Sequence, residues 1–153
     1  QVYYHLRHLR QPDNPDDTFE AQLIYGEMKA IIKTSHLVKK TYPKFLVHGT
    51  RGTFIRYDID RQETCLKGNI MPDNPLFAAE EQPALLDYID ENGSSVQASV
   101  PAVKGDYGRV YDAIYDTLTT GCPNYVSETE ALTNLEILET AFHQPSPSLI
   151  AFS

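Results

Sequence analysis

Hydrophobic and polar residues alternate over most of the chain as far as Val100, and this period of two is typical of β-strands with one buried face. Turn signals separate the runs. Gly26-Glu27, the glycines at 49 and 52, and Asn92-Gly93 each favour a chain reversal, so three β-hairpins are predicted. The predicted strands cover residues 2–7, 19–25, 28–33, 45–48, 53–57, 84–89, 95–100 and 149–152.

The period changes to that of an amphipathic helix after Pro101. A helix is predicted over residues 106–120, with Asp106 as its candidate N-cap and Gly121 as its stop. Its hydrophobic stripe contains Tyr107, Val110, Tyr111, Ile114 and Leu118. Tyrosines at helical spacing are usually core residues with a solvated rim, and we expect that role for Tyr107, Tyr111 and Tyr115.

A second long helix is predicted over residues 127–142, because Ser127 and Glu130 have the spacing of a capping box. A short helix is predicted from Asp60 to Leu66, with the Asp60 side chain as a possible cap. Residues 69–82 have no regular period and several prolines, and we interpret them as a surface excursion.

These elements indicate an α+β fold, because strands come first and helices later with no regular βαβ alternation. We expect one domain over residues 1–153, built from a largely antiparallel, open-faced sheet with the two main helices packed on one face. Alternation predicts which strand residues pack under the helices: Phe19, Ala21, Leu23, Met28, Ala30 and Ile32. The residues predicted to face outward are Gln22, Ile24, Lys29, Ile31 and Lys33.

The outward residues form a mixed apolar and polar surface that suits a sheet-to-sheet interface, so a homo-oligomer, a dimer or higher, is predicted. A monomer with singly exposed isoleucines is the alternative. The interface hypothesis depends above all on Ile24 and Ile31.

Composition narrows the classes of partner. The 153-residue chain carries 21 acidic and 13 basic side chains, a formal net charge of −8, which argues against nucleic-acid binding. Its longest apolar runs, such as Leu149–Phe152, are far shorter than the roughly 20 residues of a membrane span. Two cysteines, Cys65 and Cys122, do not make a disulfide framework, and we expect both thiols to be inert. We also expect the protein to be cytoplasmic.

The histidines offer only weak metal sites. His5 and His8 are three residues apart, and on a strand they would point to opposite faces, where they cannot chelate one ion. Lys33 and His36 have the same spacing, and we interpret them as a solvated lysine and a partly buried histidine.

Other candidate chemistry is also sparse. Asp87, Asp90 and Glu91 lie beside the Asn92-Gly93 turn and are interpreted as solvated loop charges. The sequence contains no Gly-x-Gly, Gly-x-Ser-x-Gly or Cys-x-x-Cys motif. A hydrolase that used His48 or His143 with a remote carboxylate is a third alternative, but no nucleophile motif supports it. The residues alone therefore predict a domain with no self-contained active site.

Two blocks carry a family resemblance. The first runs from Val47 to Tyr57, Val-His-Gly-Thr-Arg-Gly-Thr-Phe-Ile-Arg-Tyr, and continues as Asp60-Arg61-Gln62-Glu63-x-x-Leu66. The second is Pro101-x-x-x-Gly105-Asp106-Tyr107, followed by a helix and Gly121-x-Pro123. Both resemble signatures in the C-terminal domain of Gfo/Idh/MocA-type oxidoreductases. Three positions depart mildly from the family pattern, with Thr53 for Ser, Arg56 for Lys and Asp58 for Gly.

The resemblance implies a parent enzyme with an N-terminal Rossmann domain that binds NAD or NADP. The C-terminal domain would cover a small-molecule substrate and form the oligomer interface. The family's catalytic Glu-Lys-Pro and Asp-x-x-x-His motifs do not occur in this chain. Since Gln1 leads directly into the strand-like Val2–Leu9, we expect a chain cut from a larger protein just downstream of that histidine helix.

The preferred hypothesis is therefore the C-terminal domain of an NAD(P)-dependent oxidoreductase that acts on a sugar, polyol or related carbonyl or hydroxyl compound. No catalytic, cofactor-binding or metal-binding residue is expected within the chain, which alone should be inactive. A free-standing α+β binding or dimerisation module without catalytic activity is the alternative.

Overall fold

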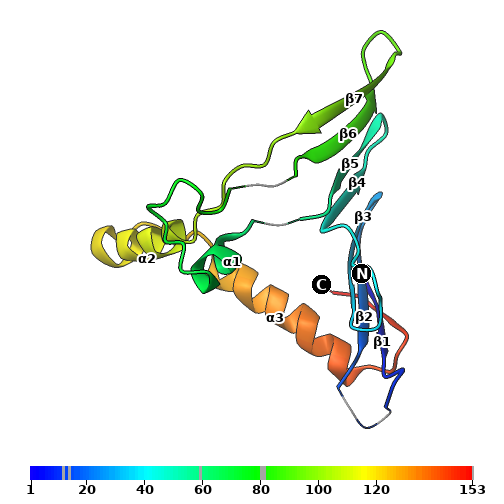
Figure 1. Ribbon diagram of the computed structural model, residues 1–153. Helices are drawn as coiled ribbons and strands as arrows, with labels where there is room; N and C mark the ends of the chain where they lie inside the picture. The colour runs from blue at the N-terminus through cyan, green and yellow to red at the C-terminus, as the bar shows by residue number, and fades with distance from the viewer. Residues whose placement is uncertain (12, 14, 59, 80–81, 153) are drawn as a thin grey trace. The chain divides into compact units, whose positions relative to one another are not determined.

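The computed structural model describes residues 1–11, 13, 15–58, 60–79 and 82–152 of the chain. These residues form eight strands and three helices in the order β1-β2-β3-β4-β5-α1-β6-β7-α2-α3-β8 (Figure 1). The chain divides into two compact units, the first made of Gln1–Thr41 and Pro123–Ser153 and the second of Tyr42–Cys122. Each unit contains its own four-stranded antiparallel sheet.

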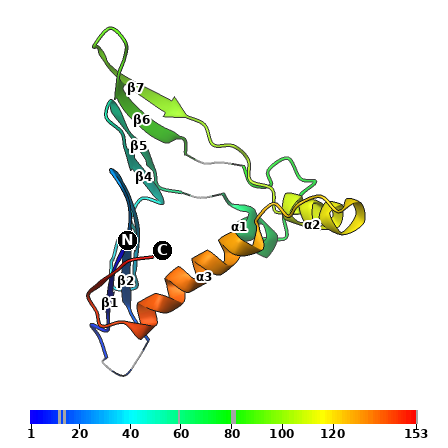
Figure 2. The ribbon, with the colours of Figure 1, turned by 180° about the vertical axis from the view of Figure 1, so that it is seen from behind.

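The first unit has the strand order β3-β2-β1-β8. Its elements are β1 (Val2–Arg7), β2 (Thr18–Tyr25), β3 (Met28–Ser35), α3 (Glu128–His143) and β8 (Ser148–Ile150). The second unit has the order β4-β5-β6-β7, which Figure 2 shows from behind. Its elements are β4 (Phe45–His48), β5 (Gly52–Arg56), α1 (Gln62–Lys67), β6 (Ala84–Ile89), β7 (Ser95–Val100) and α2 (Gly108–Thr120).

The α+β class and the antiparallel pairing predicted from the sequence are confirmed, and every predicted strand is present within two residues of its expected ends. Alternating burial accompanies the period-two pattern in the paired strands β6 and β7. In β6, for example, Ala84 is buried whereas its neighbour Leu85 is exposed.

The core of the first unit lies where α3 contacts β1. Val2, Tyr4, Ala21 and Ala141 are buried there, and the Tyr4 hydroxyl donates a 2.7 Å hydrogen bond to the Ile137 carbonyl. Burial, assisted by the Glu136 carboxylate, raises the pKa of Tyr4. The phenol is thereby held in its protonated, donating form.

Strand β1 is extended by a side chain at its edge. The hydroxyl of Ser146 accepts from the Leu6 N–H at 2.8 Å and donates to the Leu6 carbonyl at 2.7 Å. In this way Ser146 satisfies the backbone of β1 beyond the point where β8 pairs with Tyr4. The segment that follows α3 is therefore fixed to the sheet before β8 begins.

The register of β2 and β3 separates the two faces of the first sheet. Ala21 pairs with Ile32 and lies on the side of Ala141, whereas the pairs Gln22–Ile31 and Ile24–Lys29 occupy the opposite face. The predicted division of these residues between two faces is confirmed, and Phe19, Ala21 and Leu23 pack in or against the core, but the expectation that the β3 residues of the same face are buried is wrong. Met28, Ala30 and Ile32 are exposed, because α3 packs against β1 and leaves the β3 side of that face uncovered.

The second sheet contains a close approach at Gly52. A Cβ at this position would lie 2.5 Å from the Cβ of Tyr88 and 2.7 Å from the carbonyl oxygen of Asp87. Gly52 pairs directly with Tyr88 in the register of β5 and β6. A side chain there would force the two strands apart, so the glycine is required for this pairing.

A second small core forms around α1. Cys65, Phe77 and Ala78 are buried together, and Ile70 packs against them. The Cys65 sulfur accepts from the Ala78 N–H at 3.4 Å. The interpretation of residues 69–82 as a surface excursion is therefore wrong for Phe77 and Ala78, because this irregular segment folds back to cover α1; residues 80 and 81 lie outside the described part.

The two blocks that carry the family resemblance meet at Gln62. This side chain is only 2% exposed, its Nε2 donates to Asp60 Oδ1 at 3.1 Å, and its Oε1 accepts from the Tyr107 N–H at 2.8 Å. A Cβ on Gly105 would lie 2.7 Å from Gln62 Nε2 and 3.0 Å from the Asp60 carboxyl carbon. We call this set, Asp60, Gln62, Gly105 and Tyr107, the Gln62 junction.

Asp60 and Asp106 act close to where they were predicted. Asp60 Oδ1 accepts from the Gln62 N–H at 3.1 Å, and Asp106 Oδ1 accepts from the Gly108 N–H at 2.9 Å. The N-cap of α2 is nevertheless Tyr107 and not Asp106. The carboxylate of Asp106 still satisfies a backbone donor of the first turn from one position earlier.

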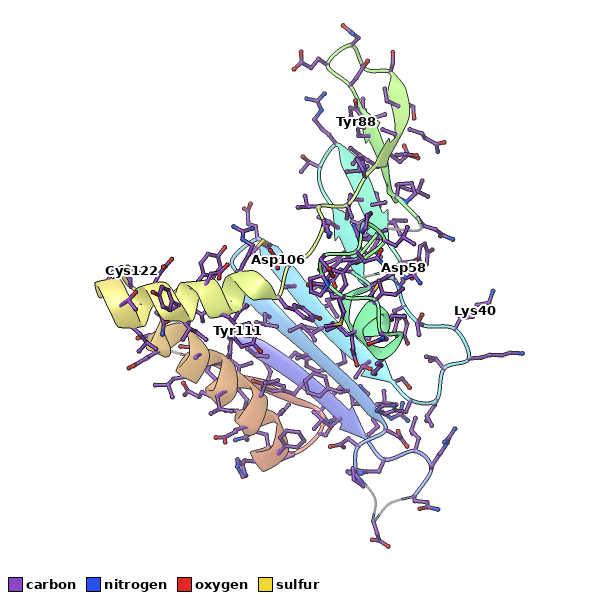
Figure 3. The ribbon with its side chains drawn as sticks, turned by 60° about the vertical axis from the view of Figure 1, so that its left-hand side comes forward. Lys40, Asp58, Tyr88, Asp106, Tyr111 and Cys122 are labelled. Carbon is purple, nitrogen blue, oxygen red and sulfur yellow. The ribbon has the colours of Figure 1, made fainter. Side chains whose placement is uncertain are left out.

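The expectation that Tyr107, Tyr111 and Tyr115 are core residues is not met within the second unit. Tyr107, Tyr111 and Tyr115 are exposed, Tyr111 by 73%, together with Val110, Ile114 and Leu118. Tyr111, labelled in Figure 3, lies in the first turn of this helix. Within the second unit, no other described helix or strand packs against α2, so its amphipathic stripe does not enter the core of that unit.

The capping box predicted at the start of α3 is confirmed. The Ser127 hydroxyl accepts from the Glu130 N–H at 3.2 Å, and the Glu130 carboxylate accepts from the Ser127 N–H at 2.8 Å. Hydrogen bonds from the Ser127 backbone and side chain lower the pKa of Glu130. The carboxylate form is therefore the one that the cap stabilises.

We predict that Ser127→Ala destabilises the chain by about 1 kcal/mol. Ser127 is exposed, so the variant loses only the hydrogen bond of a helix N-cap. Ser127→Asp, which keeps an acceptor, is the matched control and should unfold close to the parent temperature. The folded-state pKa of Glu130 is lowered, so its contribution is complete above the ordinary carboxyl pKa and is lost as the pH falls through the lowered value. Thermal unfolding followed by circular dichroism at neutral and acidic pH tests both points; equal melting of the two variants at neutral pH contradicts the capping role.

We predict that Gly105→Ala destabilises the second unit by about 1–3 kcal/mol, because its methyl group would overlap the Gln62 amide. Gly49→Ala is the control, since a Cβ at Gly49 meets only the Gly52 carbonyl oxygen at an ordinary 3.6 Å. Denaturant unfolding of both variants measures the difference. A loss at Gly49 as large as that at Gly105 would show that the Gln62 junction is not the cause.

Candidate functional site

The second unit contains a cavity of about 400 Å³ beside the Gln62 junction. Its walls come from the end of β5, the start of α1, the segment around Phe77 and the segment that leads to α2. Six charged residues line it, namely Lys44, Arg56, Asp58, Asp60, Arg61 and Lys104. We call this space the charged cavity and regard it as the candidate functional site.

Arg56 and Asp58 are placed by the sheet. Arg56 is the last residue of β5 and pairs with Phe45, while its guanidinium Nε donates to the Asp58 carbonyl at 2.7 Å. The hydrogen bond folds the arginine back over the chain that leaves the strand. Asp58, which is exposed and labelled in Figure 3, follows within the same wall.

Asp60 and Arg61 are placed by α1. The Asp60 carboxylate is held by two hydrogen bonds from Gln62, one from its backbone N–H and one from its side-chain amide. Arg61 occupies the N-cap position of the helix. Because Gln62 also binds the backbone of Tyr107, the same junction fixes the segment that carries Lys104.

Lys104 lies over an aromatic ring in this wall. Its ammonium nitrogen is 5.7 Å from the centroid of the Phe77 ring, and Phe77 is only 4% exposed. A cation at this distance from a ring face is attracted by the ring quadrupole. The contact orients the lysine while its N–H donors stay available to a bound molecule.

The charged cavity is equipped to bind and orient a small polar molecule. Guanidinium and ammonium groups donate hydrogen bonds to hydroxyl, carboxylate or phosphate oxygens, and the carboxylate of Asp58 accepts from hydroxyl groups. Within the described ranges, no group of three or more His, Cys, Asp and Glu side chains is arranged to hold a metal ion.

A second hollow, of about 620 Å³, lies on one face of the second sheet. It follows the register row Thr53, Asp87 and Gln97, in which the Gln97 amide donates to the Asp87 carboxylate at 3.0 Å. Arg51 at its end donates to the Ile89 carbonyl at 2.9 Å. This hollow is a sheet surface whose polar groups already bind one another, so it is a weaker candidate for a ligand site.

The structure separates the residues that the sequence paired as possible metal ligands. His5 is within β1, where its ring lies edge-on to Tyr3, whereas His8 lies beyond the strand and its Nε2 is 3.1 Å from Asp16 Oδ1. His36 is exposed, which corrects the expectation of a partly buried histidine, because β3 ends at Ser35.

The acidic residues near the third hairpin have different roles. Asp87 is a strand residue of β6 and not a loop charge. Asp90 Oδ1 accepts from the N–H groups of Asn92 and Ser94, each at 2.8 Å, so it organises the turn. Glu91 is exposed in that turn, as expected.

The remaining candidates lie outside the charged cavity. Cys65 is buried under Ala78, and Cys122 is exposed at the end of α2; both are free. His48 Nδ1 is 3.0 Å from the Thr53 hydroxyl, and His143 ends α3. His48 belongs to the second unit and His143 to the first.

Sequence reasoning missed the charged cavity itself. Arg56 and Arg61 were visible only as motif residues, and nothing in the sequence distinguishes Lys44 or Lys104 from other surface lysines. A usable signal was the presence of charge next to the motif segments Asp60–Gln62 and Gly105–Tyr107, because the chain must pack closely there.

None of the helices in the described chain is long and apolar enough to span a membrane.

Comparison with known proteins identifies the same family as the two motif blocks. The family described as "Oxidoreductase family, C-terminal alpha/beta domain" (Gfo/Idh/MocA type) matches residues 1–148. The uncharacterized oxidoreductase YhhX of Escherichia coli is 59% identical over 152 residues, which is 99% of this chain and 44% of that protein. The scyllo-inositol 2-dehydrogenase (NADP(+)) IolW of Bacillus subtilis is 28% identical over 136 residues, covering 87% of this chain and 38% of that protein.

Solved structures agree in fold. A crystal structure of the probable oxidoreductase yhhX superimposes with a TM-score of 0.92 at 58% identity, covering 99% of this chain and 44% of the other. An oxidoreductase from Bacillus cereus superimposes with a TM-score of 0.90 at 43% identity, covering 96% of this chain and 44% of the other. The chain thus spans less than half the length of these relatives, and it belongs to the Gfo/Idh/MocA oxidoreductase family as a C-terminal alpha/beta domain.

Proposed function

We propose that this chain is the substrate-shaping domain of an NAD(P)-dependent, cytoplasmic oxidoreductase that acts on a sugar, polyol or related compound. One observation carries the proposal. The two segments that resemble the family signature are joined by the buried Gln62 amide, and the residues next to them line the charged cavity. The printed name of IolW, an inositol dehydrogenase that uses NADP, supports a polyol-like substrate and a nicotinamide cofactor.

The residues of this chain do not fit a dinucleotide. A pyrophosphate is usually held by free N–H groups at a helix N-terminus that follows a glycine-rich loop. At α2 the Gly108 N–H already binds the Asp106 carboxylate, and at α3 Glu130 and Ser127 cap each other. Acidic side chains at both helix starts would repel phosphate, so a nicotinamide cofactor would be held by the remainder of the parent protein.

The proposed role of this chain is accordingly to bind and orient substrate. Lys104, held over Phe77, presents fixed donors to a substrate oxygen, and Arg56, whose Nε is held by the Asp58 carbonyl, lines the same cavity. Fixed donors lose little conformational freedom when a ligand binds, which favours a single orientation of the reacting carbon. The hydride chemistry itself belongs to the cofactor.

The first test compares the chain with the gene-length protein that contains it. We predict that the 153-residue chain does not bind NADPH in a calorimetric titration and catalyses no nicotinamide-dependent oxidation or reduction. The gene-length protein that contains it should oxidise at least one compound from a panel of sugars, polyols and sugar acids with NAD or NADP. Micromolar NADPH binding by the chain alone would overturn the proposal that the remainder of the parent protein holds the cofactor. A gene-length protein that is inactive on the whole panel would favour the free-standing binding module.

We also propose that the parent forms a homo-oligomer through the outer face of the first sheet. Ile31 is 51% exposed there, and Ile24 lies diagonally beside it in the register. The row next to them is polar, with Glu20 accepting from Gln22 at 2.6 Å and lying 3.7 Å from the Lys33 ammonium. A flat surface with central apolar residues and paired polar neighbours suits a symmetric sheet-to-sheet contact.

We predict that the chain is a dimer or larger in light scattering and that the Ile24→Lys, Ile31→Glu double variant is monomeric, because charges would be buried in the contact. Ile32→Glu is the matched control. Ile32 is equally a solvent-exposed residue of β3, but it lies on the opposite face of the same sheet. A monomeric parent chain, or a dimer that responds only to Ile32→Glu, would exclude the proposed interface.

A further inference from the structure

The charged cavity gathers positive charge in a chain that is acidic overall. Lys44, Arg56, Arg61 and Lys104 all line it, which is four of the 13 basic residues of a chain with formal net charge −8. They come from four separate segments of the second unit: the approach to β4, the end of β5, the start of α1 and the approach to α2. Such convergence against the overall charge is unexpected for residues that only keep a surface solvated.

Two carboxylates, Asp58 and Asp60, line the same walls, so the described lining contains two more positive than negative side chains. Asp60 directs its Oδ1 to Gln62, where it accepts from both the backbone N–H and the side-chain amide. Gln62 is buried, and these bonds make Asp60 a part of the junction. Among the described lining residues, Asp58 is the other carboxylate.

The two lysines are the most accessible donors. Both Lys44 and Lys104 are exposed, and neither forms an ion pair with another described residue. The one contact of the Lys104 ammonium described above is with the Phe77 ring face, which uses its charge and none of its N–H groups. Lys104 is thus held in place with no carboxylate partner among the described residues, and Lys44 is an exposed ammonium group in the same lining; both are suited to a ligand oxyanion.

The floor of the cavity strengthens this preference. Phe77 and Ala78 are buried apolar residues of the α1 core and form part of the lining. A charge interaction beside an apolar wall is screened less than one in open solvent. A space of about 400 Å³ holds a small molecule of the size of a sugar or polyol.

We infer that the charged cavity binds the anionic group, a carboxylate or a phosphate, of a small substrate, so that the substrate is a sugar acid or sugar phosphate and not a neutral polyol. The inference rests on the proposed function for its place in a reaction, but the binding itself is a property of this chain. Lys44 and Lys104 would contact the oxyanion, while the hydroxyl groups of the same molecule would extend toward Asp58.

Calorimetric titration of the chain with three probes tests the inference. Gluconate supplies a carboxylate, glucose 6-phosphate supplies a phosphate, and sorbitol is the neutral control. We expect one of the two anions to bind, with an affinity that falls as salt is added, and sorbitol to bind at least about tenfold more weakly because it forms no charge-assisted hydrogen bond. Tighter binding of gluconate would identify the bound group as a carboxylate, and tighter binding of glucose 6-phosphate would identify it as a phosphate.

Variants locate the binding. Lys44→Ala with Lys104→Ala should weaken the preferred anion by about tenfold or more, and Lys104→Arg should retain most of the affinity. Lys67→Ala is the matched control, because Lys67 is an exposed lysine of α1 that pairs with Glu63 and lies outside the cavity. All variants replace exposed side chains, and their unfolding temperatures are measured to verify that the fold is unchanged.

The outcomes separate this inference from the proposed function. No binding of either anion, equal binding of sorbitol, or an equal effect of Lys67→Ala overturns the anion site. Anion binding by the chain together with a gene-length protein that lacks nicotinamide-dependent activity leaves the site in place and overturns the oxidoreductase proposal. Activity of the gene-length protein on neutral polyols alone, with no anion binding by the chain, overturns the anion site and leaves the oxidoreductase proposal in place.

Discussion

The buried amide of Gln62 is the constraint on which the second unit depends. A buried amide that lacks partners costs about 1–3 kcal/mol, so its donor and acceptor must both be satisfied within the protein. Here the donor is taken by Asp60 and the acceptor by the backbone of Tyr107, 45 residues later in the chain. Gly105 must be a glycine because the amide occupies the space that a side chain would need.

The charged cavity follows from this junction. Asp60 and Arg61 lie on one side of it and Lys104 directly precedes Gly105 on the other, so a single hydrogen-bonded group positions charged residues from two distant segments. The Phe77 segment then closes the floor by packing onto Cys65 of α1. The motif residues are thus mainly structural, and their neighbours supply the side chains that face a ligand.

The chain also presents apolar surface that it does not cover itself. The stripe of α2 is exposed, with Leu118 accessible over 81% of its surface, and the β3 side of the first sheet is open at Ile32. Exposed apolar surface of this extent marks an interaction site in most proteins. The chain spans 44% of the length of YhhX and 38% of that of IolW.

Local sequence determined the secondary structure closely. Alternation located the strands, Ser127 and Glu130 identified the start of α3, and Gly121 marked the end of α2, where it adopts φ 73°. These features depend on residues near one another in the chain, so a single sequence contains them. The α+β class followed from the order of strands and helices, and the family resemblance added the oxidoreductase assignment.

Tertiary structure decided what each stripe and each charge does. The amphipathic period of α2 predicted a buried face for Tyr111, but burial requires a packing partner, and the described part of the second unit does not provide one. The sequence placed Phe77 in a surface excursion, but in the structure its segment packs against α1. Lys44 and Lys104 are 60 positions apart, and only the packing around Gln62 brings both to one cavity, because convergence of distant side chains is a property of the folded chain and not of any local pattern.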